Sequence, residues 1–498
     1  MTDPKTSVEI EQLRNHSPAA AKAYAEEWLK KAPDSFEALQ FYGLLWAKEN
    51  NFDKALMYFQ RALLHDANRP SIHTNLSNVY VACGEVEKAL GHLYQALRLQ
   101  PFHAEAYNNL GRLLYKQGRL AEAMPHFEKA LRLDPNYWEA HYNLAHSLAT
   151  QNQWVRAATH YEAVIRLFPS HPIAHFNLAL IYLVEEKYLE AERHLNKTLE
   201  LDPHHVEATK RLGEVFLEQG KSQEAFALFK KALDLRPDLA DVHHNLAILY
   251  LRNGDKSQAL FHFAEAFRLD PSNETAAHMI ASLSNTTPPS STPLSYITQL
   301  FDQYADHYNE HLKNQLNYQV PTLLRNGIGR CFGNNPKAGR VLDLGCGTGL
   351  CGIVFRDLAL ELVGVDLSPK MIAHATLLGA YDKLIVSDFN EYLRSPLEPF
   401  DLIIAADVFV YSSALENIFA KIAQILVAQG RFIFSTETLE TGTYRLQSTG
   451  RFAHSKEYIE ALAKKNHFFI ELSESIILRE GASPISGHLY ILKLVASV

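Results

Sequence analysis

Small and hydrophobic residues recur every 34 positions along the first half of the chain. Alanines keep this period from Ala55 to Ala259, and a column of small residues keeps it from Gly43 to Ala247. Prolines follow at the same spacing from Pro101 to Pro271. An alanine lets two crossing helices approach closely, and a proline just after a helix ends it. The pattern predicts seven helical hairpins in register.

The array resembles the tetratricopeptide repeat, a helix hairpin that stacks into a superhelix. Residues 1–35 match the 34-residue pattern only weakly, through Ala21, Ala25 and Pro33. They are predicted to form a degenerate half-repeat. Residues 36–284 are assigned to the seven repeats and a closing helix. The next stretch, SNTTPPSSTPLS, has the composition of a linker, so we place the linker at 285–294 and a second domain at 295–498.

Asparagines form one further column of the repeat lattice, just before a leucine of each first helix. They are Asn75, Asn109, Asn143, Asn177 and Asn245, and Arg211 breaks the series. Asparagine in a helix interior is about 0.5 kcal/mol less favourable than alanine, so a compensating interaction is expected. A side-chain amide both donates and accepts, as a peptide unit does.

The column resembles the asparagine ladder in the repeat domain of O-linked N-acetylglucosamine transferases. That resemblance implies a concave groove that binds a protein or peptide. The alternative is that the amides only bond neighbouring repeats.

The second half alternates short apolar runs with helical patterns. The runs at 340–344, 361–367, 383–389, 399–407 and 430–435 are predicted strands, and helices are predicted at 368–380 and 415–430. This alternation predicts an α/β domain with a parallel, doubly wound sheet. Ligands of such sheets bind beyond the carboxyl ends of the strands, where the stretch VLDLGCGTGL falls.

The glycines of that stretch allow two interpretations. Gly347, Gly349 and Gly352 fit the dinucleotide pattern GxGxxG, which would indicate a nicotinamide or flavin enzyme. Asp343, Gly345, Gly347 and Gly349 also fit DxGxGxG, beginning at the strand end. In either case Asp366, which ends the next strand, suits the hydroxyls of a ribose.

Residues after the third and fourth strands favour the second interpretation. Asp388 and Phe389 place an acid and an aromatic where an adenine ring could be hydrogen-bonded and covered, and Asp407 ends the fourth strand. The set resembles the class I S-adenosylmethionine-dependent methyltransferases over about residues 295–498. The resemblance implies a Rossmann-like fold and S-adenosylmethionine as cofactor.

Family membership would also assign roles to the residues around the loop. The glycine loop, with the backbone of Cys346, would lie against the methionine portion, and Asp343 would face its amino group directly or through water. Leu367 and Ser387 flank the two acids and join the cofactor set. No metal ligand is expected.

A closer resemblance is to predicted methyltransferases that carry such repeats. The matching stretches are 301–321 and 444–455. Two turns depart from the usual pattern, YSSAL after Tyr411 and AQG before the fifth predicted strand. The sequence from Asp407 to Tyr411 lacks the [DN]PP[YFW] motif of enzymes that methylate amide or adenine nitrogens, which argues against such substrates.

Candidate acceptor-site residues lie in those two stretches. Tyr304, Tyr308 and His311 have helical spacing and would cover the cofactor, unless they are core contacts. Arg451 and His454 lie in a predicted loop with little packing reason to exist, so Arg451 would bind a carboxylate or phosphate and His454 would accept a proton. A surface salt bridge is the alternative for Arg451, and Arg479 is a further candidate.

Composition and charge restrict the classes of protein to which the chain can belong. The formal charge of -8 argues against a general nucleic-acid binder, and no apolar run reaches the roughly 18 residues of a membrane span. The start of the chain lacks a signal pattern, so we expect a cytoplasmic protein.

We expect a methyltransferase whose repeats recruit a protein, itself a candidate methyl acceptor. The alternative is a repeat scaffold whose catalytic half methylates a small carboxylic acid or acyl-carrier thioester, or is inactive.

Overall fold

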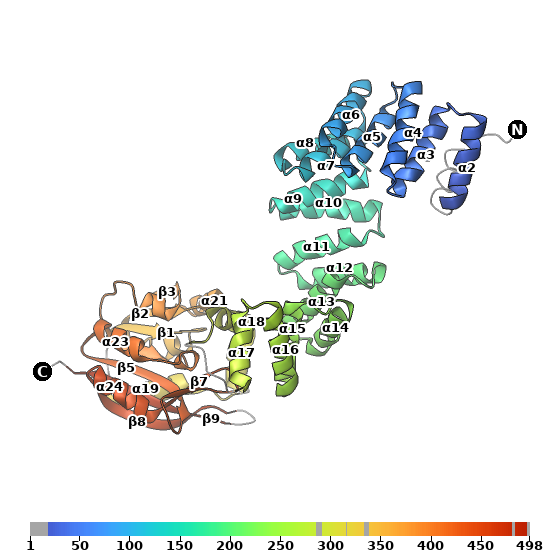
Figure 1. Cartoon of the computed structure of the whole chain (residues 1–498). Helices are drawn as coiled ribbons and strands as arrows, with labels where there is room; N and C mark the ends of the chain where they lie inside the picture. Colours follow the sequence, from blue (N-terminus) through green and yellow to red (C-terminus); the bar gives the residue numbers. More distant parts are fainter. Residues whose placement is uncertain (1–17, 285–290, 315, 333–337, 481–483, 496–498) are drawn as a thin grey trace. The chain divides into compact units, whose positions relative to one another are not determined.

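The computed structural model describes residues 18–284, 291–314, 316–332, 338–480 and 484–495. The chain divides into two compact units, Met1–Val215 and Phe216–Val498. The first consists of helical hairpins, and the second combines the last hairpins with an α/β sheet. The predicted fold class, a tetratricopeptide array followed by a Rossmann-like domain, is confirmed (Figure 1).

Seven helix pairs follow one another, with α2 (Pro18–Lys31) before them and α17 (Glu274–Ser284) after them. The first helices of the pairs are α3 (Phe36–Lys48), α5 (Pro70–Ala82), α7 (Ala104–Lys116), α9 (Trp138–Thr150), α11 (Pro172–Val184), α13 (Val206–Glu218) and α15 (Ala240–Arg252). The second helices are α4 (Phe52–His65), α6 (Val86–Leu99), α8 (Leu120–Leu133), α10 (Trp154–Leu167), α12 (Tyr188–Leu201), α14 (Ser222–Leu235) and α16 (Lys256–Leu269).

The repeated small residues allow the helices of a pair to pack closely. All seven alanines from Ala55 to Ala259 are 0% exposed. In the first pair, a Cβ on Gly43 would lie 2.5 Å from the ring of Phe59, so only glycine fits beneath that ring. The 34-residue period is therefore a period of close contacts between helices.

The sheet of the second unit contains nine strands among the described residues. They are β1 (Ala338–Leu344), β2 (Ala359–Asp366), β3 (Lys383–Val386), β4 (Phe400–Ala405), β5 (Leu426–Leu439), β6 (Tyr444–Leu446), β7 (Phe452–Ser455), β8 (Phe468–Arg479) and β9 (Ile485–Leu494). Strands β3, β2, β1, β4 and β5 lie side by side in this order and run parallel, as predicted. The strand order reverses between β1 and β4, which places a ligand crevice there.

The far side of the sheet is mixed, with a parallel pairing of β5 and β7 and antiparallel pairings elsewhere, which the sequence analysis did not predict. Strand β9 pairs antiparallel with both β5 and β8, and the short β6–β7 hairpin pairs through β7 with the end of β5. A short connection can join only antiparallel strands, and β8 and β9 are joined by residues 480–484.

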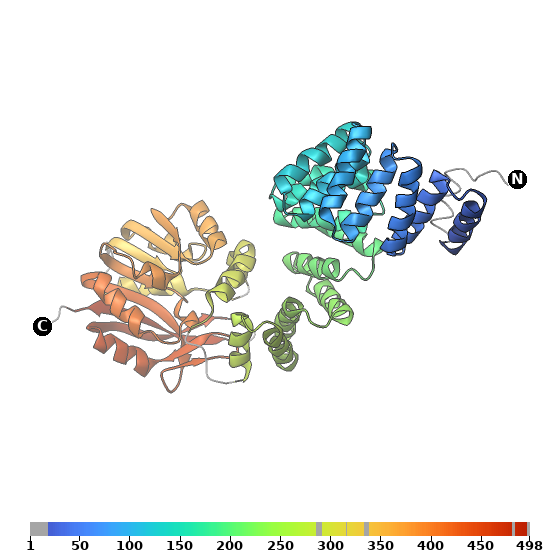
Figure 2. The same cartoon turned by 45° about the horizontal axis from the view of Figure 1, so that its top comes forward.

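Among the described residues of the second unit, eight helical segments surround the sheet (Figure 2). They are α18 (Leu294–Asn314), α19 (Val320–Phe332), α20 (Leu350–Phe355), α21 (Pro369–Leu378), α22 (Phe389–Tyr392), the 3-10 helix Phe409–Tyr411, α23 (Glu416–Ile425) and α24 (Lys456–Lys465).

The two predicted helices of this unit are present, with shifted ends. Helix α21 is capped by the side chain of Ser368 and ends at Gly379, whose φ of 63° no longer continues the helix. Helix α23 ends at Ile425, so the prediction of helix to residue 430 is wrong there. Residues 426–430 already belong to strand β5.

The predicted linker is only partly described, because residues 285–290 lie outside the described residues. Ser291 forms a β-bridge with Ser412, and the backbone N–H of Thr292 donates to the carbonyl of Tyr411. This end of the linker therefore packs on the sheet domain. No helix in the described part of the chain is both long enough and apolar enough to span a membrane.

Candidate active site

The turn after β1 depends on glycine. Gly345, Gly347 and Gly349 have φ values of 65°, 54° and 94°, in the left-handed region. A Cβ on Gly345 would lie 2.6 Å from a methyl carbon of Val408, whereas one on Gly347 would meet nothing within 4 Å. Bare backbone is therefore needed for a close contact at Gly345 and leaves open space above Gly347.

Strand β2 holds this loop in place. The N–H groups of Gly345 and Cys346 donate to the carbonyl of Val365 at 2.8 and 3.0 Å. The N–H of Gly347 donates to Oδ2 of Asp366 at 2.8 Å. The glycine loop and the acid that ends β2 are thus one hydrogen-bonded assembly.

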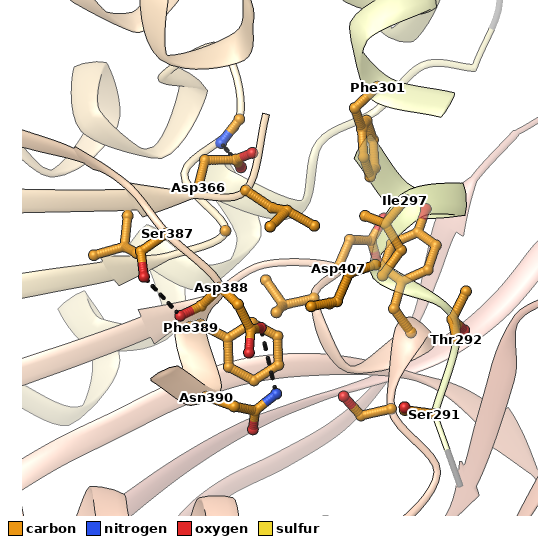
Figure 3. Close-up of a pocket in the computed structure, with 18 of the residues that line it drawn as sticks. Ser291, Thr292, Ile297, Phe301, Asp366, Ser387, Asp388, Phe389, Asn390 and Asp407 are labelled. Carbon is orange, nitrogen blue, oxygen red and sulfur yellow. Dashed lines mark hydrogen bonds between the residues drawn. The ribbon is translucent and has the colours of Figure 1, made fainter. Parts of the chain in front are cut away.

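A pocket of about 270 Å³ lies beyond the carboxyl ends of β1 to β4. One wall comes from the strand ends, with Asp366, Ser387 and Phe389 (Figure 3). The facing wall comes from Thr292 and from Ile297 and Phe301 of helix α18 (Figure 3). The pocket lies where the strand order reverses, as expected for a doubly wound sheet.

Most of the predicted cofactor residues meet at this pocket. Its lining includes Gly345, Gly347, Asp366, Leu367, Ser387, Asp388, Phe389 and Asp407. Asp366 also accepts the N–H of Ser368 on Oδ1 at 2.9 Å. Burial raises the pKa of Asp366, and the N–H donors of Ser368 and Gly347 act in the opposite direction. The oxygens are therefore held in a fixed orientation at the pocket edge.

Three other predicted cofactor residues, Asp343, Cys346 and Gly349, do not line the pocket. Asp343 is 1% exposed and accepts the hydroxyl of Tyr381 at 2.7 Å. Burial raises the pKa of Asp343 to about 7, against the lowering effect of that hydrogen bond. Asp343 lies in β1 behind the loop, and Cys346 and Gly349 belong to the loop backbone, so the three support the shape of the loop.

Asp407 belongs to a buried charge cluster with Arg479 and Glu437. Nη2 of Arg479 lies 2.5 Å from Oδ2 of Asp407, and Nη1 lies 3.5 Å from Oε1 of Glu437. Their side chains are 7%, 11% and 8% exposed, for Arg479, Asp407 and Glu437. Burial raises the pKa of Glu437 to about 7, although the charge of Arg479 lowers it. The guanidinium of Arg479 thus contacts two carboxylates, one of which lines the pocket.

Of the three residues predicted on α18, Tyr308 lines the pocket, and its ring contacts Phe301 with centroids 5.9 Å apart. The side chains of Tyr304 and His311 lie outside the described residues. Ring contacts also join Phe301 to Tyr411 at 5.6 Å, so aromatic side chains from α18 and from the segment after β4 meet at this wall.

Arg451 and His454 do not line the pocket. His454 lies in strand β7 rather than in a loop, is 1% exposed and donates from Nε2 to the carbonyl of Ser413 at 2.9 Å. Burial lowers its pKa to about 4. Arg451 lies 3.8 Å from Glu437 and so extends the charge cluster. Packing and buried contacts therefore explain why Arg451 and His454 occur in the β6–β7 hairpin, and the sequence pattern did not reveal these contacts.

The asparagine column has varied surroundings. Nδ2 of Asn143 donates to Asn108 of the preceding repeat at 2.8 Å, and Nδ2 of Asn177 donates to the hydroxyl of Tyr161 at 3.1 Å. Asn109 is 6% exposed, and its Nδ2 has no hydrogen-bond partner in the described part of the chain. Asn75 and Asn245 are half-buried. Two of the five amides thus bond neighbouring helices.

A groove of about 500 Å³ in the first unit includes one member of this column, Asn177. Asn177 and Arg211 border it, together with apolar side chains that include Trp154, Ile181 and Val184. Glu207 and Glu214 hold the guanidinium of Arg211 at 3.0 Å each.

Histidine pairs in the repeats are a feature that the sequence analysis did not predict. Nδ1 atoms of histidines 19 positions apart lie 2.9 to 3.0 Å from each other in four repeats. The pairs are His73–His92, His141–His160, His175–His194 and His243–His262. The recurrence of 19 within a period of 34 is the sequence signal that could have revealed them.

Family models match both the repeat half and the sheet half of the chain. Residues 316–472 match a family model described as a methyltransferase domain. Models described as tetratricopeptide repeats match residues 10–71, 74–137, 114–175, 170–238 and 209–272.

Similar proteins include several methyltransferases. Methyltransferase-like protein 27 of Homo sapiens is 32% identical over 106 residues, which are 21% of this chain and 43% of that protein. A ubiquinone biosynthesis O-methyltransferase of Rhodopseudomonas palustris is 26% identical over 28% of this chain and 57% of its own. A malonyl-[acyl-carrier protein] O-methyltransferase of Legionella pneumophila is 28% identical over 33% and 58%. The chain spans about half the length of these relatives.

Among solved structures, the crystal structure of YrrB, a TPR protein described as having an unusual peptide-binding site, is 22% identical. It covers 37% of this chain and 96% of its own, with a TM-score of 0.35.

Proposed function

We propose that this chain, which joins tetratricopeptide repeats to a methyltransferase domain, is an S-adenosylmethionine-dependent methyltransferase whose repeats recruit a protein or peptide. One observation carries the proposal. Asp366, Asp388 and Phe389 surround a single pocket beside the glycine loop. This arrangement offers a carboxylate for ribose hydroxyls, and an acid and an aromatic ring for adenine.

The residues present fit that cofactor. The open space above Gly347 leaves room against the loop, and the volume of about 270 Å³ approaches the lower end of ordinary ligand pockets, roughly 300 Å³. Asp343 would act through the loop it supports or through water, since it lies behind the pocket surface. Bound S-adenosylmethionine supplies a methyl group already activated by its sulfonium.

The protein's own task is then to position the acceptor and exclude water. Proximity and orientation are worth roughly 7 to 11 kcal/mol at best in such a displacement. Phe301, Tyr308 and Tyr411 give the acceptor side an aromatic wall that keeps water away.

The pocket offers few groups that could remove a proton. No histidine, lysine, cysteine or glutamate is among the described residues that line it. The carboxylate of Asp407 is bound by Arg479, and His454 is buried away from the pocket. These facts favour an acceptor that is already deprotonated at neutral pH, such as a carboxylate. The names of two relatives, both O-methyltransferases, support an oxygen acceptor.

Recruitment by the repeats rests on the groove beside Asn177. Its apolar walls and polar border suit an extended peptide, and the asparagine column would bind the peptide backbone. The recruited chain is then a candidate methyl acceptor. The alternative is a small carboxylic acid or acyl-carrier thioester as acceptor, with the repeats as a scaffold, and the named activity of one relative supports it.

Calorimetry with S-adenosylmethionine and with NAD tests the cofactor, and binding of NAD alone would refute the proposal. A pull-down with the full chain, followed by transfer of a radiolabelled methyl group, tests recruitment. Label in a retained protein supports the protein acceptor, and label only in added small acids supports the alternative.

A further inference from the structure

Helix α17, which closes the repeat array, contacts the turn between β6 and β7 through two side chains. Nε2 of His278 donates to the carbonyl of Gly450 at 2.9 Å, and Oγ of Ser282 donates to the carbonyl of Gln447 at 2.8 Å. Both donors are 1% exposed. Nζ of Lys256 on α16 adds a hydrogen bond to Oγ of Ser448 at 3.1 Å.

The turn is shaped to receive this helix. Gly450 has a φ of 77°, and a Cβ on it would lie 3.2 Å from the sulfur of Met279 and 3.6 Å from the hydroxyl of Tyr296. The N–H of Gly450 donates to the carbonyl of Gln447, and the N–H of Gln447 donates to the carbonyl of Arg451. Both the left-handed turn and the close approach of α17 therefore require glycine.

The β6–β7 hairpin leads from this contact to the pocket. His454 of β7 donates to the carbonyl of Ser413, next to the pocket residue Ser412. Arg451 at the start of β7 pairs with Glu437, which shares Arg479 with the pocket residue Asp407. The contacts thus run from α17 to the segment 407–413.

A second connection reaches the same segment from the chain that leaves the repeats. Ser291 bridges to Ser412, and the N–H of Thr292 donates to the carbonyl of Tyr411 at 3.2 Å. Asp366 ends β2 and Asp388 follows β3, so these two predicted cofactor residues lie on neither route, whereas Asp407 lies within the segment that both routes reach.

We propose that His278 and Ser282 are positioning residues. The closing helix of the repeats holds the β6–β7 hairpin, and through it the acceptor side of the pocket at 407–413. This inference rests on the proposed function, because only a methyltransferase has an acceptor site. The last helix of the recruiting domain would then be a structural part of that site. The matching stretch 444–455 then serves to couple the two domains rather than to contact substrate directly.

Hydrogen exchange of the full chain tests the coupling without needing the acceptor. In His278→Ala we expect about tenfold faster amide exchange in 444–455 and in 407–413, the effect of one lost hydrogen bond. His278→Gln keeps an N–H donor near the position of Nε2 and should restore slow exchange.

His244 provides a matched control. It lies 34 residues earlier in the same register and is 8% exposed, and its ring packs on Phe263 rather than on the sheet domain. His244→Ala should leave exchange in both segments unchanged. Equal effects of His244→Ala and His278→Ala, or no change at 407–413 in His278→Ala, would overturn the inference.

Calorimetry with S-adenosylmethionine separates this inference from the proposed function. We expect the dissociation constant of His278→Ala to stay within about twofold of wild type, because Asp366 and Asp388, which would bind the ribose and the adenine, lie on neither route. A parallel loss of cofactor affinity would mean general damage and would overturn the positioning role. Failure of the wild-type chain to bind S-adenosylmethionine would refute the proposed function, while the exchange result would still decide the coupling.

Discussion

Arg479 and Asp407 form an ion pair at the base of the pocket, with Nη2 and Oδ2 2.5 Å apart. The two residues are separated by 72 positions, and β8 and the end of β4 bring them together. Glu437 also contacts Arg479, so the loss of this cation would deprive Asp407 of its buried partner and leave Glu437 with the more distant Arg451, 3.8 Å away.

We therefore expect Arg479→Met to destabilise the sheet domain by about 3 to 5 kcal/mol, the usual effect of breaking a buried pair from one side. All four tryptophans lie between residues 28 and 154, so tryptophan fluorescence follows only the first unit. The urea midpoint should fall in far-ultraviolet circular dichroism and stay fixed in fluorescence. A shift in both signals, or in neither, would contradict the role of the cluster.

Arg431 provides a control for the pocket itself. It pairs with Glu471 at 2.6 Å on β5 and β8, and neither residue lines the pocket. Arg431→Met should leave affinity for S-adenosylmethionine unchanged, even where it lowers stability.

Local patterns made the parallel half of the sheet predictable. The glycine loop and the acid of Asp366 follow their strands directly, so the order of elements alone brings them to one edge. Strands β6 and β7 were missed, because strands of three and four residues carry too few positions for a pattern. Strands β8 and β9 are long, but they form an antiparallel hairpin outside the strand–helix alternation from which the sheet was predicted. The bond of His278 to Gly450 spans 172 positions, and no periodicity reports such a contact.

Asp366 should determine cofactor affinity. Its carboxylate lines the pocket and is oriented by the N–H groups of Gly347 and Ser368. Since a hydrogen bond to a charged group is worth about 1.5 to 3 kcal/mol, Asp366→Ala should weaken S-adenosylmethionine binding at least about tenfold in calorimetry.

Asp382 offers the comparison, because it pairs with Arg356 at 2.6 Å near the start of β3 and does not line the pocket. Asp382→Ala should bind the cofactor as wild type does. If Asp366→Ala binds S-adenosylmethionine with unchanged affinity, Asp366 is not the residue that binds the ribose.

The histidine pairs should make the repeats less stable in acid. Burial, with the neighbouring His141, lowers the pKa of His160 to about 4, and burial with His175 does the same for His194. The side chains of Arg156 and Arg193 act in the same direction. In the unfolded chain these histidines titrate near 6.5. Between these values the unfolded state binds more protons, so stability is complete above about pH 6.5 and falls as the pH drops towards 4.

The chain itself supplies the control for this prediction. Thr209 and Leu228 occupy the positions of a histidine pair in a later repeat. His141→Thr combined with His160→Leu should therefore reduce the loss of melting temperature between pH 7.5 and pH 5, measured by tryptophan fluorescence. An equal loss in the double variant and in wild type would show that other groups cause the acid sensitivity.

The asparagine column should bind a peptide in addition to joining repeats. Replacing Asn109, Asn143 and Asn177 together by alanine removes three amides, each worth about 0.5 to 1.5 kcal/mol in a hydrogen bond, so partner binding should weaken by roughly 2 kcal/mol or more. The partner is the protein recovered by pull-down with the full chain, and titration calorimetry measures its affinity.

Single variants separate the two roles of the column. Asn143 and Asn177 bond Asn108 and Tyr161, so their replacement should also lower the melting temperature of the first unit. The amide nitrogen of Asn109 is buried without a hydrogen-bond partner in the described residues, and alanine has the better helix propensity. Asn109→Ala should therefore leave the fold as stable as wild type or more so, while partner affinity falls. Lost stability with unchanged affinity in all three single variants would show that the column only ties repeat to repeat, and recruitment would then depend on the apolar walls of the groove.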